Sequence, residues 1–116
     1  MKHLKLIFKN SNIVMKKRNY FFNKFELKII LNFYAKMVSK GFWKDYGLNL
    51  SKEEVSFNVY KRASDNAEFK ICKNFKTKNK NLKYFMSDSQ GNILNMSKDL
   101  EELIDKTIWK NLKLVN

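Results

Sequence analysis

The strongest constraint in this sequence is residues 24–40, where apolar side chains recur with the period of an α-helix. Asn23 and Glu26 form a capping-box pattern at its start, and Gly41 suits the position just beyond a helix end. The apolar positions cover one broad face and comprise Leu27, Ile30, Leu31, Phe33, Tyr34, Ala35, Met37 and Val38. The pattern predicts a helix over 24–40 with one face available for packing.

After residue 45 the pattern changes to alternation of apolar and polar side chains, which is typical of half-buried strands. Short segments rich in Ser, Asn, Asp and Gly separate the alternating runs, as expected for tight turns. The apolar members are Tyr46, Leu48, Leu50, Val55, Phe57, Val59, Phe69, Ile71, Leu82, Tyr84, Met86 and either Ile93 or Leu94. Such short connections predict an antiparallel meander of four or five strands.

A last helix is expected to open at Ser97, with acidic residues in its first turn. Its apolar stripe follows helical spacing and comprises Leu100, Leu103, Ile104, Thr107 and Ile108. The order helix, strands, helix predicts an α+β domain with both helices packed on one face of the sheet.

We expect a single domain over residues 22–113, preceded by a basic, flexible tail at 1–21 and followed by a short end at 114–116. The formal charge of +13 invites a nucleic-acid interpretation. However, the cations are 22 Lys and only 2 Arg, and residues 1–24 alone hold seven cations and no acid. An AT-rich genome favours Lys codons over Arg, so the charge by itself is a weak indication of function.

Several classes of protein are disfavoured by residue content. Cys72 is the only cysteine, which points to a reducing, cytoplasmic setting, and His3 is the only histidine. A Cys/His zinc site and a His-based catalytic triad are therefore not expected. No phosphate-binding loop and no apolar run of about 20 residues occurs. We expect a non-enzymatic cytoplasmic protein with no cofactor, metal or membrane span.

Three pieces of the chain carry a family resemblance: FNKFELKIILNFYAKMVSKGFWKDY at 22–46, VSFNVYKRASDNAEFKICK at 55–73 and GNILNMSKDLEEL at 91–103. With these pieces the sequence resembles an uncharacterised family of small alphaproteobacterial proteins, domain-of-unknown-function family 2794. It departs from the family at Asp65-Asn66 and in a Lys-rich rather than Arg-rich loop at 76–81. The resemblance implies a bacterial cytosolic origin and no particular activity.

The Trp-x-Asp-Tyr element, Trp43, Asp45 and Tyr46, is interpreted as a structural joint between the first helix and the sheet. Large aromatic side chains are usually buried and need one polar partner, which favours this interpretation. The alternative is a pocket rim in which Trp43 serves as a stacking surface.

A candidate binding surface follows from strand alternation, which directs Tyr60 and Arg62 away from the helices if Val59 faces them. Aromatic and cationic side chains on an open sheet face can stack bases and neutralise phosphates. The full set is Tyr60, Arg62, Lys70, Lys76, Lys78, Lys80, Lys83 and Phe85. Nucleic acid, either RNA or DNA, is the leading expected partner.

Alternatives to this surface stay open at the level of sequence. An ion pair between Arg62 and a carboxylate such as Asp45 or Glu68 is an equal alternative to a phosphate contact. The face can be an ordinary solvated one, or the apolar positions Tyr60, Phe85, Phe33 and Ile29 can serve a homodimer or a protein partner.

Overall fold

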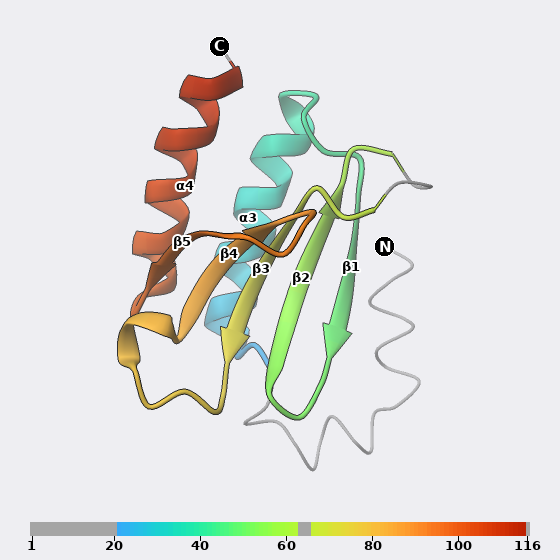
Figure 1. The fold of residues 1–116 in the computed structure, drawn as a ribbon. Coiled ribbons are helices and arrows are strands. Elements are labelled where there is room, and N and C mark those ends of the chain that lie inside the picture. The colour runs from blue at the N-terminus through green and yellow to red at the C-terminus, as the bar shows by residue number, and fades with distance from the viewer. Residues whose placement is uncertain (1–20, 63–65, 116) are drawn as a thin grey trace.

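The computed structural model describes residues 21–62 and 66–115, with side chains described as far as Thr107. Five antiparallel strands form one sheet in the order β1-β2-β3-β4-β5, and both helices lie on the same face of it (Figure 1). The predicted α+β fold is therefore confirmed. The elements are α3 (Lys24–Ser39), β1 (Asp45–Leu50), β2 (Glu54–Tyr60), β3 (Phe69–Asn74), the 3-10 helix η2 (Lys80–Leu82), β4 (Tyr84–Asp88), β5 (Ile93–Ser97) and α4 (Leu100–Val115).

Both ends of α3 have the geometry that the sequence predicts. The Asn23 side chain accepts a hydrogen bond from the Glu26 backbone N–H, and the Glu26 carboxylate accepts one from the Asn23 backbone N–H, each at 2.7 Å. At the other end Gly41 has φ 83°. The Phe42 N–H donates to the Met37 carbonyl at 3.0 Å, which completes a Schellman stop. The helix ends at Ser39, one residue before the predicted boundary.

The core lies between the sheet and the two helices. Val55, Phe57 and Val59 of β2 have no exposed surface and face this core, as alternation predicts. Ile30 of α3 and Leu103 of α4 are equally buried in the same cluster. One face of the sheet is thereby covered by helices, and the other face is available to position a site.

Two boundaries differ from the sequence-based prediction. Leu82 lies in η2 rather than in a strand, because Asn79 caps a helical turn just before β4. Ser97 is the last residue of β5 and does not open the final helix. Instead the Asp99 carbonyl accepts the Leu103 N–H at 3.0 Å, which places the start of α4 two residues later than expected.

Of the two apolar positions that the sequence offers for β5, Leu94 is half-buried and Ile93 is exposed. Ile93 is 48% exposed, whereas Asn95 is buried and donates to the Thr107 hydroxyl oxygen at 3.4 Å. An irregularity between Met86 and Ser87 shifts the register of the β4–β5 pair. This shift changes which residues of β5 face α4, and alternation within β5 alone cannot reveal it.

The expected basic tail at 1–21 lies outside the described residues apart from Phe21, and the 114–116 end is described only as helical backbone to Val115. Within the described part of the chain, no helix is both long and apolar enough to cross a membrane.

Candidate functional site

Trp43 and Tyr46 are buried between α3 and the sheet. The Trp43 ring lies edge-on to Phe33 of α3 with ring centroids 5.0 Å apart, and Tyr46 stacks on Phe57 of β2 at 4.7 Å. The Asp45 carboxylate accepts the Tyr46 backbone N–H at 2.8 Å. Because Trp43 is only 2% exposed, it offers no free ring face to a ligand. The geometry is that of a joint, and the pocket-rim alternative does not fit it.

The predicted binding surface divides into two groups at opposite ends of β3. Tyr60 ends β2, Arg62 follows it, and Lys70 lies near the start of β3. The connection from β3 to β4, which carries Lys76, Lys78, Lys80 and Lys83, leaves the other end of the sheet (Figure 1). Six residues of β3 separate the groups, which corresponds to roughly 15–20 Å. The structure does not bring the eight residues together into one surface.

The open face of the sheet is not strongly basic. Pairing places Lys70 opposite Asn58 and Cys72 opposite both Ser56 and Phe85. Lys73 of the same strand bonds to Glu26 of α3, so it faces the helices and adds no charge to this face. Among the described strand residues on this face, Lys70 is the one cation, while Asp45 and Glu54 contribute carboxylates.

Cys72 lies buried on this face, and its thiol is expected to be unreactive. Burial, followed by the nearby Glu54 carboxylate, raises the pKa of its thiol to about 12. The thiol therefore stays protonated at neutral pH, and it is a poor nucleophile and a poor metal ligand. No group of three or more His, Cys, Asp and Glu side chains is placed to hold a metal ion within the ranges that the structure describes.

Residues 75–83 form a basic connection with several local hydrogen bonds, named here the Lys-rich loop. The Asn74 side chain accepts the Lys76 N–H at 3.0 Å, and the Asn79 side chain accepts the Asn81 N–H at 3.0 Å. These side-chain hydrogen bonds fix the backbone, and Thr77 adds a third by accepting the Asn79 N–H at 3.1 Å. The exposed cations of the loop are Lys76, Lys78, Lys80 and Lys83, and no acidic residue lies among them.

A buried polar cluster that the sequence analysis missed links α3 to the sheet. The Glu26 carboxylate accepts hydrogen bonds from Lys73 of β3 at 2.7 Å and from the Tyr84 hydroxyl of β4. Burial alone would raise the pKa of Glu26, but the hydrogen bonds from Lys73, Tyr84 and the Asn23 backbone together hold it below its usual value. Burial and the same carboxylate raise the pKa of Tyr84. The capping box indicated Glu26, but its partners lie 47 and 58 residues away.

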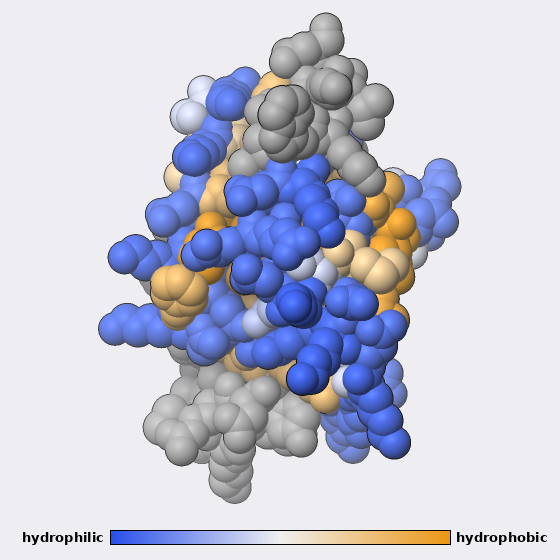
Figure 2. All heavy atoms as spheres, turned by 90° about the vertical axis from the view of Figure 1, so that its left-hand side faces the viewer, coloured by the Kyte–Doolittle hydropathy of each residue, from blue (hydrophilic) through white to orange (hydrophobic). Residues whose placement is uncertain are grey.

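Four large apolar side chains are exposed among the described residues: Phe25 and Val38 of α3, and Ile93 and Met96 of the edge strand β5. Ile93 is 48% exposed and Met96 is 42% exposed, and Met96 lies opposite the half-buried Phe85 of β4. Figure 2, which views the molecule from the left-hand side of Figure 1, shows a largely hydrophilic surface with apolar residues gathered in separate patches. Phe33, an expected contributor to a partner surface, is instead 4% exposed and belongs to the core.

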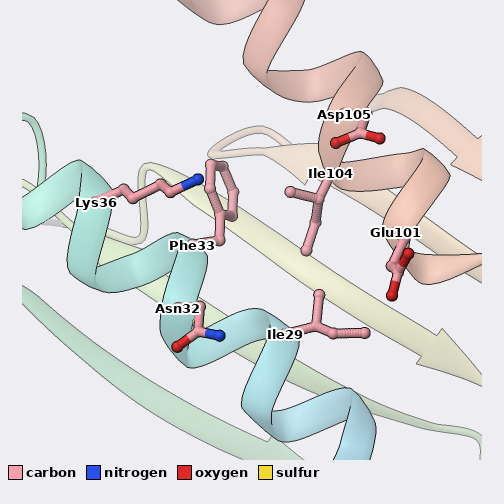
Figure 3. Close-up of a pocket in the computed structure, with 7 residues that line it drawn as sticks. All are labelled: Ile29, Asn32, Phe33, Lys36, Glu101, Ile104 and Asp105. Atoms are coloured by element: carbon pink, nitrogen blue, oxygen red, sulfur yellow. The ribbon is translucent and has the colours of Figure 1, made fainter.

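A groove of about 240 Å³ lies between α3 and α4 (Figure 3). Ile29, Phe33 and Ile104 give it an apolar floor. Polar side chains flank the floor on both helices: Asn32 and Lys36 from α3, Glu101 and Asp105 from α4. The sequence contains both polar pairs at helical spacing, but it does not indicate that these four side chains flank one groove.

These observations define a small α+β domain in which two helices cover one face of an antiparallel five-stranded sheet. Residues 20–104 match the family described as Protein of unknown function (DUF2794), and the chain belongs to this family. The matched region contains α3, the whole sheet and the first turn of α4. No curated protein and no solved structure matches the chain.

Proposed function

We propose that this protein binds nucleic acid through backbone phosphates, using the Lys-rich loop rather than the open sheet face. The observation that carries the proposal is the loop itself: four exposed lysines within eight residues, on a backbone held by Asn74, Thr77 and Asn79. An ordered loop loses little conformational entropy when its lysines meet phosphates. The proposal involves no catalytic step and places the protein in the cytoplasm.

Phe21, the first residue that the structure describes, lies close to the end of β3 from which this loop starts. Lys73, in the last part of β3, donates a hydrogen bond to the Phe21 carbonyl at 3.1 Å. Phe21 therefore lies beside the strand that leads into the loop, and the sequence holds seven cations within residues 1–24. Lysine ammonium groups act as point charges without the planar fork that reads a base edge. We accordingly propose binding with little sequence preference.

Fluorescence anisotropy with labelled tRNA and duplex DNA, from low to physiological salt, tests this proposal. Affinity should fall steeply with salt, because binding releases counterions from phosphates. Replacing the four loop lysines by Gln should lower the slope of log K against log salt by about three to four, since each phosphate contact contributes roughly 0.9. The matched control removes the same charge elsewhere, by Lys28→Gln, Lys40→Gln, Lys44→Gln and Lys98→Gln.

The control separates a local site from bulk charge. If the loop variant and the control lose affinity equally, the loop is not the site. If neither nucleic acid binds even at low salt, the proposal fails.

A second candidate function, a protein-interaction module, is favoured by the exposed Ile93 and Met96 on β5. Edge strands with exposed apolar side chains are frequent association sites. Sedimentation velocity of the full chain over a range of concentrations at high salt tests self-association, which should be insensitive to salt. Met96→Lys should abolish any association, while Val38→Lys, on an exposed position of α3, should leave it intact.

A further inference from the structure

The groove between α3 and α4 has a charge arrangement that complements a specific class of small molecule. We infer that it binds a free α-amino acid with a large apolar side chain. Its volume of about 240 Å³ is below the roughly 300 Å³ at which pockets for drug-sized ligands begin. A nucleotide or another large cofactor is therefore too big for it, whereas a leucine or a phenylalanine is of suitable size.

The floor of the groove accounts for the apolar part of the ligand. Ile29 and Phe33 of α3 and Ile104 of α4 line it, and Figure 3 shows Ile29 and Ile104 directed toward one another across the gap. Phe33 is 4% exposed and Ile104 is 6% exposed, so the floor is part of the packed core and is fixed in place. An aliphatic or aromatic side chain placed on it would be removed from water.

The walls of the groove account for the two charged groups of the ligand. Asn32 and Lys36 are four residues apart on α3, which puts an amide donor and an ammonium group on one wall. Glu101 and Asp105 are four residues apart on α4, which puts two carboxylates on the other. The first pair suits a ligand carboxylate and the second pair suits a ligand ammonium group.

The two walls do not satisfy one another. Among the described residues no ion pair within 4.0 Å joins Lys36 to Glu101 or Asp105. The neighbouring carboxylate on the same helix, Glu102, does have a partner, since it lies 3.1 Å from Lys106. Two like charges one turn apart disfavour a helix, and a bound cation between them would remove that repulsion. The ammonium and carboxylate groups of an α-amino acid are attached to the same carbon atom, so that end of the ligand can present one charge to each wall while its side chain lies on the floor.

Two-dimensional amide NMR of the full ¹⁵N-labelled chain, titrated with L-leucine and L-phenylalanine, tests this inference. We expect saturable shifts at residues 29–36 and 101–105. N-acetyl-L-leucine lacks the ammonium group and L-leucinamide lacks the carboxylate. Each should bind about tenfold more weakly or worse, because a charge-assisted hydrogen bond is lost. L-serine, which lacks the apolar side chain, should not produce saturable shifts.

Variants locate the site independently of the ligand series. Lys36→Gln and Asp105→Asn should each weaken leucine binding about tenfold. The matched controls Lys28→Gln and Glu102→Gln lie on the same two helices outside the groove lining and should leave it unchanged. All four positions are exposed, so the amide spectra should show an intact fold.

Several outcomes would overturn the inference. These are shifts that never saturate, saturable shifts confined to residues outside the groove, equal binding of the capped analogues, and undiminished binding by the two groove variants.

Discussion

Glu26 of α3 and Lys73 of β3 hold their carboxylate and ammonium groups 2.7 Å apart, although 47 residues separate them in the chain. Their side chains are only 6% and 12% exposed. Lys73 also donates to the Phe21 carbonyl, and the Tyr84 hydroxyl donates to Glu26. One carboxylate thereby caps the first helix and ties it to two strands, so this cluster fixes where α3 sits on the sheet.

Replacing Glu26 by Gln should destabilise the domain by about 3 kcal/mol, because it leaves the Lys73 ammonium group largely buried without its counter-charge. Tyr84→Phe should cost about 1–2 kcal/mol, since one hydrogen bond to a charged group is lost. Urea unfolding followed by circular dichroism measures both changes. Glu102→Gln is the control, because its ion pair with Lys106 is about half exposed and should contribute nothing measurable. Similar losses in Glu26→Gln and Glu102→Gln would contradict the central role of the cluster.

Stability should also decrease in acid because of Glu26. Its pKa in the folded domain lies below the ordinary value, since the hydrogen bonds from Lys73 and Tyr84 outweigh the opposing effect of burial. A carboxyl group with a lowered folded pKa stabilises the fold above its unfolded pKa of about 4.3, and that stability is lost as pH falls through the folded pKa. The urea concentration at the unfolding midpoint should therefore decrease once the pH is lower than about 4.3. Glu26→Gln should make this pH dependence shallower. An unchanged acid dependence in the variant would assign it to other carboxylates.

The elements of this fold could be predicted because their patterns are local. The cap at Asn23 and the stop at Gly41 each involve residues within one turn, so the bounds of α3 follow from the sequence. The alternation of Val55, Phe57 and Val59 identifies the inner face of β2 for the same reason.

The sequence identifies the lysines of the loop, but the arrangement of the candidate sites could not be predicted because it depends on how elements meet. Lys70 and Lys76 are close in sequence but lie at opposite ends of β3, so an expected single surface becomes two groups. The groove requires Lys36 and Asp105 to face each other from different helices, and no pattern within either helix specifies that. The register shift between Met86 and Ser87 likewise decides which residues of β5 are buried.

Cys72 should be unreactive in the folded protein. Burial and the Glu54 carboxylate raise its pKa to about 12, and the thiolate is the form that reacts with alkylating agents. Labelling with iodoacetamide at neutral pH should be slow for the native chain and fast in concentrated urea, as followed by intact-mass spectrometry. Rapid labelling under native conditions would show that the open face exposes the thiol.

Gly41 should be needed for its backbone conformation rather than for lack of space. Its φ is 83°, and a Cβ built there would meet nothing within 4 Å. Gly41→Ala should therefore destabilise the domain by about 1 kcal/mol, the usual cost of placing a Cβ in the left-handed region. Gly41→Asn should cost less, because asparagine tolerates this region better than other residues with side chains.

Lys40→Ala, on an exposed residue with φ −88°, is the control and should have little effect. Thermal unfolding of the three variants provides the measurement. Equal losses for alanine and asparagine at position 41 would mean that the added side chain, and not the backbone, causes the change.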